Sequence, residues 1–195
     1  FHKTTEKLDL GIFYDKYVGR ENVVTLKKSV IHNNTLYQII SVGEEKSKTY
    51  LAEIAIPEKS GQLRFLDAYP VDLKADESIT YDVPVIISDS RIKFFSVVKP
   101  NKVISFDTET KKFDYYSFLE DTATDEENWY KLRIIDDVLY AMQISATDNR
   151  YSIFKIGDTG KETLLIEGDL PKTEIRDNHW IADFYVIEAD QQDEQ

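Results

Sequence analysis

The chain has 195 residues, a hydrophobic content of 42% and a net charge of −12, and it contains no cysteine. A chain of this length and composition can bury one sizeable core. Its acidic balance disfavours nucleic acids and anionic membrane surfaces as partners, because both require basic patches. The lack of cysteine excludes disulfides, thiolate metal sites and cysteine nucleophiles.

The acidic surplus lies in the C-terminal two thirds of the chain. Residues 1–65 contain 10 Lys/Arg and 8 Asp/Glu, a balance of +2, and residues 66–195 contain the remaining 14 and 28, a balance of −14. No apolar run approaches the about 18 residues that cross a bilayer. Since the first residue is Phe1, we expect a chain trimmed from a longer precursor. We expect an extracytoplasmic or cell-surface location, with the cytoplasm as the alternative.

Four times along the chain an apolar run ends in a two-residue turn and a second apolar run follows. The turns are Asn33-Asn34, Asp89-Ser90, Asp136-Asp137 and Asp177-Asn178. Such residues tolerate the positive φ angles of tight hairpins, so each turn predicts a hairpin between two half-buried strands. The turns start 56, 47 and 41 residues apart, a spacing that is typical of the blades of a β-propeller.

Three repeats contain four predicted strands each, at residues 28–70, 83–120 and 130–170. In every repeat the apolar runs are separated by polar turns. The predicted strands are Lys28–His32, Thr35–Val42, Thr49–Ile56 and Gln62–Ala68; Val83–Ile87, Ile92–Val98, Lys102–Phe106 and Phe113–Phe118; and Tyr130–Ile135, Val138–Ser145, Tyr151–Ile156 and Thr163–Glu167.

Two predicted strands remain at each end of the chain. Leu8–Tyr14 and Asn22–Leu26 precede the first repeat, and Thr173–Arg176 and Trp180–Glu188 begin a fourth. Closing the ring removes exposed sheet edges, and the two ends of a propeller chain commonly share one blade. We therefore predict an all-β single domain, a propeller of four-stranded antiparallel blades in which residues 173–188 and 8–26 form the fourth, closing blade. The alternative is an open segment of a larger propeller.

The hairpin Phe106–Phe113 has the order acid, threonine, basic residue (Asp107, Thr108, Lys111) that is found in many propeller blades. On this motif and on the repeat spacing, residues 28–188 resemble generic β-propeller repeats of the quinoprotein-like or kelch-like kind. The paired glycines of kelch repeats are missing. The resemblance therefore implies a fold and carries no catalytic residue over to this chain.

The candidate binding residues lie in two long acidic connections. In a propeller, the links between blades open onto one face together with the turns between second and third strands, and loops on a rigid scaffold often carry function. Aromatic side chains on such a face are typical interface anchors, although packing between blades is the alternative role for them. The candidates are Tyr69, Asp72, Asp76, Glu77, Tyr81, Asp121, Asp125, Glu126, Glu127 and Trp129.

The sequence predicts no catalytic residue, no metal site and no cofactor. His32 and His179 flank two turns without supporting carboxylates, and residues 120–128 lack the EF-hand pattern. Our leading hypothesis is a non-enzymatic binding or scaffold module, the extracytoplasmic part of a bacterial protein, that binds a protein, peptide or cationic ligand. The alternative is a carbohydrate-active or other hydrolytic propeller with paired carboxylates.

Overall fold

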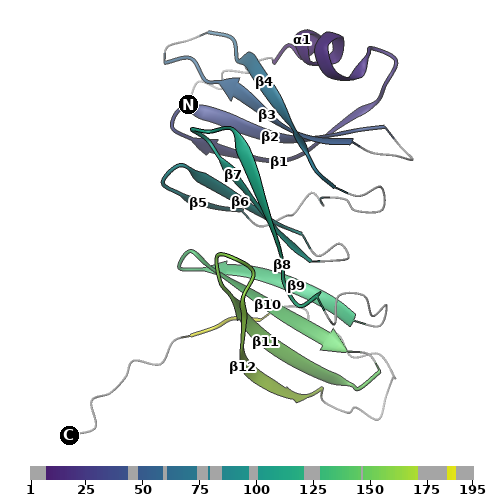
Figure 1. The fold of residues 1–195 in the computed structure, drawn as a ribbon, viewed down its shortest axis with the longest axis vertical. Coiled ribbons are helices and arrows are strands. Elements are labelled where there is room, and N and C mark those ends of the chain that lie inside the picture. Colours follow the sequence, from purple (N-terminus) through teal and green to yellow (C-terminus); the bar gives the residue numbers. More distant parts are fainter. Residues whose placement is uncertain are drawn as a thin grey trace, which may run out of the picture.

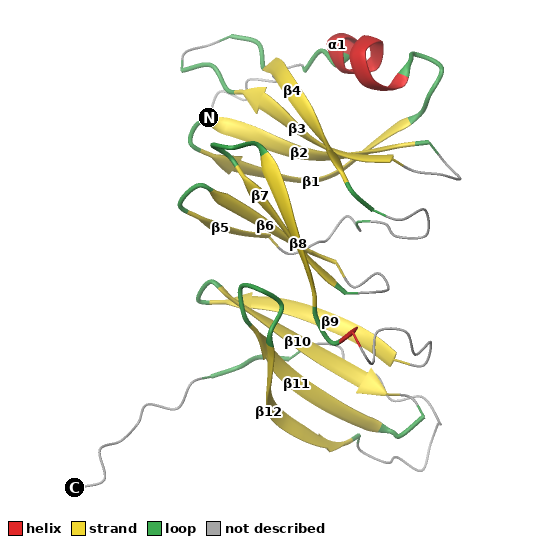
Figure 2. Ribbon diagram, viewed as in Figure 1, coloured by secondary structure: helices red, strands yellow, loops and turns green. Residues whose placement is uncertain are grey.

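The structure, a computed structural model, describes residues 8–43, 48–58, 61–73, 79, 85–96, 101–120, 128–145, 147–170 and 184–187. Within these ranges it contains twelve strands in three four-stranded antiparallel sheets. In each sheet, strands that follow one another in sequence pair side by side. The three sheets lie face to face in a stack, and in the described part of the chain they do not close into a ring (Figures 1 and 2).

The strands follow the predicted order. The first sheet contains β1 (Val24–His32), β2 (Thr35–Val42), β3 (Lys48–Ala55) and β4 (Arg64–Val71). The second contains β5 (Val85–Ser88), β6 (Arg91–Ser96), β7 (Lys102–Asp107) and β8 (Lys112–Ser117). The third contains β9 (Asn128–Ile135), β10 (Val138–Ser145), β11 (Arg150–Ile156) and β12 (Glu162–Asp169). The all-β class is confirmed.

Three of the four predicted turns are tight hairpins. Asn33 and Asn34 have φ angles of 46° and 57°, Asp136 and Asp137 have 49° and 59°, and Asp89 has 47°. Asn and Asp adopt this left-handed conformation more readily than other non-glycine residues, which explains their position here. The fourth predicted turn, Asp177-Asn178, and the predicted strand Thr173–Arg176 lie outside the described residues. Of the predicted strand Trp180–Glu188, residues 184–187 are described, and they form no strand.

The predicted strand Leu8–Tyr14 is wrong. Leu8 makes one isolated parallel bridge with Leu63, and the chain then forms α1 (Gly11–Phe13) and the π-helical turn η1 (Tyr14–Val18). The apolar residues Leu10, Phe13 and Tyr17 have helical spacing, and they pack on the outer face of the first sheet. Phe13 is fully buried there, with its ring 5.6 Å from the ring of Tyr50.

The predicted strand Asn22–Leu26 is not a separate strand either. Val24–Leu26 forms the beginning of β1, which is longer than the predicted Lys28–His32. An irregularity in the pairing with β2 falls between Leu26 and Ser29. Such a β-bulge interrupts the apolar alternation, so the two halves of β1 look like two strands in the sequence.

The second sheet is buried on both faces, and this sandwich is the core of the molecule. Ile92 and Phe94 of β6 pack against the first sheet, and Phe95 and Val103 pack against the third. A strand covered on both faces needs apolar residues at consecutive positions, and β6 has Phe94-Phe95 and β7 has Val103-Ile104 there. The outer face of the first sheet is covered by α1 and η1, and Phe184 and Val186 pack on the outer face of the third.

Phe106 provides a test of this stacking. It is fully buried between the first two sheets, with ring centroids 5.1 Å from Tyr69 and 4.8 Å from Phe113. We expect Phe106→Ala to lower the free energy of unfolding by about 3–5 kcal/mol because it leaves a cavity. Ile31→Ala, at a position that is 61% exposed, is the control and should change it by less than about 0.5 kcal/mol. Urea denaturation measures both, and equal effects would contradict the stacked arrangement.

Candidate functional site

Three of the ten predicted binding residues are described. Asp72 is exposed directly after β4, and Trp129 is 42% exposed near the start of β9. Both lie on the side of the stack opposite the tight hairpin turns, because the end of β4 pairs with the start of β3 and the start of β9 pairs with the end of β10. Tyr69 lies within β4 and packs between the first two sheets. The remaining candidates lie outside the described residues: Asp76, Glu77, Tyr81, Asp121, Asp125, Glu126 and Glu127.

A buried carboxylate joins the first and second sheets on the opposite side of the stack, the side where the tight hairpin turns lie. The side chain of Glu53, on β3, is 12% exposed. Lys111 Nζ donates to Glu53 Oε1 at 2.7 Å and to Oε2 at 2.9 Å. The Tyr69 hydroxyl donates to Oε2 at 2.8 Å, and the Tyr37 hydroxyl donates to Oε1 at 3.5 Å. The carboxylate therefore has three partners, one of which belongs to the neighbouring sheet.

Local backbone geometry presents Lys111 to this carboxylate. Lys111 lies in the β7–β8 turn with φ of 60°. Asp107 holds the turn, because its carboxylate accepts the backbone N–H groups of Glu109 at 3.0 Å and Thr110 at 2.8 Å. These hydrogen bonds, that from Thr110 above all, lower the pKa of Asp107. The acid, threonine, basic residue order of this hairpin thus builds a turn that contacts the preceding sheet.

Burial fixes both tyrosines of this cluster in the neutral form. It raises the pKa of Tyr37 to about 12, and the charge of Glu53 adds to the shift. Burial and the hydrogen bond to Glu53 also raise the pKa of Tyr69 well above its usual range. A neutral phenol can donate a hydrogen bond to a carboxylate, whereas a phenolate cannot. The carboxylate, the lysine and the two tyrosines of the cluster are hydrogen-bonded to one another, so the cluster serves to connect the two sheets.

The interface between the second and third sheets carries a salt bridge at the corresponding place, but here the central strand supplies the base and the turn supplies the acid. Lys93 is the third residue of β6, and the matching third residue of β2 is Tyr37, the cross-strand neighbour of Glu53. Lys93 Nζ lies 2.6 Å from Asp158 Oδ1 in the β11–β12 turn, and the two side chains are 13% and 87% exposed. In both interfaces, a central strand of one sheet therefore pairs with the last turn of the next sheet.

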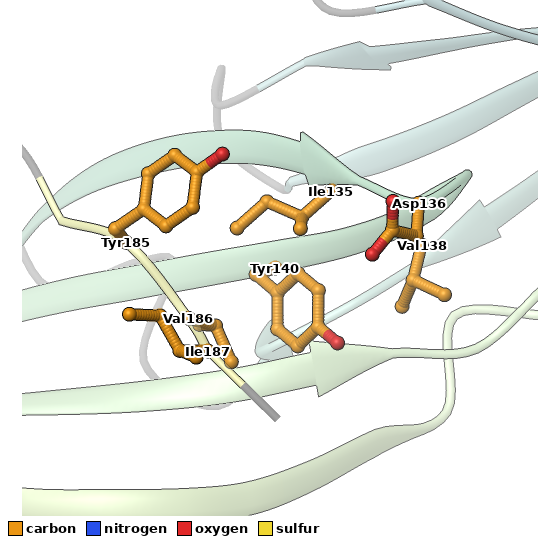
Figure 3. A pocket seen from close by; sticks show the side chains of 7 residues that line it. All are labelled: Ile135, Asp136, Val138, Tyr140, Tyr185, Val186 and Ile187. Atoms are coloured by element: carbon orange, nitrogen blue, oxygen red, sulfur yellow. The ribbon is translucent and has the colours of Figure 1, made fainter. Parts of the chain in front are cut away.

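A cavity of about 520 Å³ lies on the outer face of the third sheet (Figure 3). The β9–β10 hairpin forms one wall, and the segment 184–187 crosses over it. Val186 is half-buried against the sheet, whereas Tyr185 and Ile187 are 78% and 84% exposed. The lining residues are Ile135, Asp136, Val138, Tyr140, Tyr185, Val186 and Ile187. The cavity is thus lined by four aliphatic side chains, two tyrosines and one carboxylate.

Glu53 is not among the predicted binding residues, although the sequence contains a signal for it. Glu53 is the one charged residue between Tyr50 and Pro57, inside an apolar strand. A charged residue at such a position requires a partner, because an unpaired buried carboxylate is costly. The identity of that partner could not be read from the sequence, since Lys111 is 58 residues away along the chain.

Comparison with known proteins leaves the function to be argued from the structure. The chain matches no protein-family model and no curated protein. Among the described residues, no three His, Asp or Glu side chains come together in a way that could hold a metal ion. In the same part of the chain, no helix has the length and apolar character needed to cross a bilayer.

The Glu53–Lys111 pair can be tested with a double-mutant cycle. We expect Lys111→Met to lower the free energy of unfolding by about 1–3 kcal/mol, because it leaves a buried carboxylate without its cation. Glu53→Gln in the same chain should restore part of that loss. Lys112→Met, at an exposed neighbouring position, is the matched control. Chemical denaturation measures both single variants, Lys111→Met and Glu53→Gln, the double variant and the control, and additive single effects would argue against the pair.

The buried phenols predict a loss of stability at alkaline pH. Because the pKa of Tyr37 is raised to about 12, its contribution is complete below the unfolded value of about 10 and disappears as the pH rises through 12. Tyr37→Phe should therefore flatten the fall of stability between pH 10 and 12. Tyr185→Phe removes an exposed phenol and should leave the slope as it is. Denaturation midpoints at several pH values give the comparison, and an unchanged slope in Tyr37→Phe would refute this assignment.

Proposed function

We propose that this chain is a non-enzymatic binding or scaffold module built from propeller-type blades. The supporting observation is that the buried charged groups at both interfaces are used to join sheets. Glu53 is bonded by Lys111 and two tyrosines, and Lys93 pairs with Asp158. Groups satisfied in this way stabilise a rigid stack. A rigid stack is well suited to present loops to a partner.

The segment 184–187 supports a fourth blade. Phe184 and Val186 pack on the outer face of the third sheet, and Ile187 lines the cavity with Ile135, at the hairpin-turn end. The segment crosses the outer face of this sheet (Figure 3). Alternate residues face the third sheet, as in a strand. We propose that it is the first strand of a further blade.

The lengths of the links agree with this proposal. The links before the second and third sheets span residues 72–84 and 118–127, and the link before Phe184 spans residues 170–183. On the outer face of the first sheet, α1 and η1 occupy the place that a closing blade would need. These two observations favour an open array of blades over a closed four-bladed ring.

We further propose that the partner binds on the side of the stack opposite the tight hairpin turns. Asp72 and Trp129 are exposed there, and the balance of −14 in residues 66–195 attracts positive charge to this part of the chain. The expected partner is a protein, peptide or other cationic ligand. An extracytoplasmic or cell-surface location in a bacterium belongs to the same proposal.

Binding of a fluorescent decalysine peptide tests the proposed face. We expect Trp129→Ala combined with Asp125→Lys and Glu126→Lys to weaken binding at least about tenfold, because an aromatic anchor and two attractive charges are lost. The melting temperature should stay within a few degrees of the wild type. Fluorescence anisotropy at two salt concentrations measures the affinity.

A matched control carries Glu109→Lys and Glu162→Lys, two exposed acidic positions at the hairpin-turn end. It changes the net charge equally and should affect binding much less. Equal losses in both variants would mean that the peptide responds to net charge alone, and the proposed face would be wrong. A wild-type chain that does not bind the peptide would refute the cationic ligand.

A further inference from the structure

A second cavity, of about 220 Å³, lies between the second and third sheets near their hairpin turns. Its apolar wall consists of side chains that are at most 7% exposed: Ile86, Phe95, Val103, Leu139 and Ile156. An engineered apolar cavity of about 150 Å³ holds a benzene molecule, so this one has room for a branched alkyl or aryl group.

The interface between the second and third sheets, which contains this space, differs from the interface between the first and second sheets at three matched positions. The cross-strand pair Tyr37 and Glu53 of the first sheet corresponds to Lys93 and Ser105 of the second. Phe106, which fills the first interface, corresponds to Ile156 in the third sheet. Smaller or more flexible side chains thus replace an aromatic cluster.

Charged residues of both signs surround the cavity. Lys93 and Lys155 contribute positive charge, and Asp137 and Asp158 contribute negative charge. Lys93 is largely buried and pairs with Asp158, which lies on an exposed turn and is itself 87% exposed. Breaking the pair leaves the Asp158 carboxylate in water, which costs little free energy. The buried Lys93 ammonium group then needs another anion as its partner.

We propose that this cavity binds a free α-amino acid with an apolar side chain. The carboxylate of the ligand pairs with Lys93, its ammonium group pairs with Asp158 or Asp137, and its side chain occupies the apolar space. One intramolecular salt bridge is exchanged for two to the ligand, so no buried charge is left unpaired. The site lies on the opposite side of the stack from the proposed partner-binding face and does not depend on it.

Titration of the isotopically labelled chain with L-phenylalanine and with L-leucine, followed by NMR, tests the proposal. We expect saturable shifts at the amides of Val103, Leu139 and Ile156. Lys93→Met should weaken binding at least about tenfold, because a charge-assisted hydrogen bond is lost. Lys112→Met, at an exposed position on the β8 strand, is the matched control and should bind as the wild type does.

Two further comparisons make the test specific. Ile156→Phe places at the second interface the residue that fills the first, and it should abolish binding in a chain whose circular dichroism is unchanged. If this variant does not fold, Lys93→Met decides alone. Phenylacetate lacks the ammonium group, phenethylamine lacks the carboxylate, and both should bind at least about tenfold more weakly than phenylalanine. Equal binding of either analogue, retained binding in Lys93→Met, or no shifts at about 10 mM amino acid would overturn the proposal.

Discussion

The structure depends on the burial of the second sheet between the other two. Phe94 and Phe95 are neighbours in β6, point to opposite faces and are both almost fully buried. Removal of this apolar surface from water is the main stabilising contribution, and it requires both neighbouring sheets to be present. A single meander of four strands would leave one face of such a strand exposed. The three sheets are therefore expected to form one cooperative unit.

Charged residues fix how the stacked sheets are aligned with one another. Hydrophobic contacts are non-directional, so two apolar sheet faces could slide or rotate against each other. The pairs Glu53–Lys111 and Lys93–Asp158 join the sheets near the same edge of each interface. Their polarity alternates, since the central strand supplies the acid in one interface and the base in the other. An exchange of partners between interfaces would bring like charges together, and this disfavours a wrong order of sheets.

Much of the architecture could be predicted, because it rests on local chemistry. The turns at Asn33-Asn34 and Asp136-Asp137 fixed the hairpins, and alternating apolar residues fixed the strands around them. The helix at residues 11–18 was missed although Leu10, Phe13 and Tyr17 have helical spacing. Its stability comes from packing on the first sheet, since an isolated helix this short is only marginally stable in water. The helical propensity of this short segment alone does not reveal its contact with the first sheet.

The sequence by itself determined the all-β class, the positions of three hairpins and the acidic character of the C-terminal two thirds. These properties follow from residue type and short spacings. Only the tertiary structure decided that Tyr69 packs against a neighbouring sheet, that Glu53 meets Lys111, and that a cavity lies between the second and third sheets. Such features join residues tens of positions apart, so they depend on how the sheets stack, and side-chain patterns within one repeat do not encode the residue that will face them.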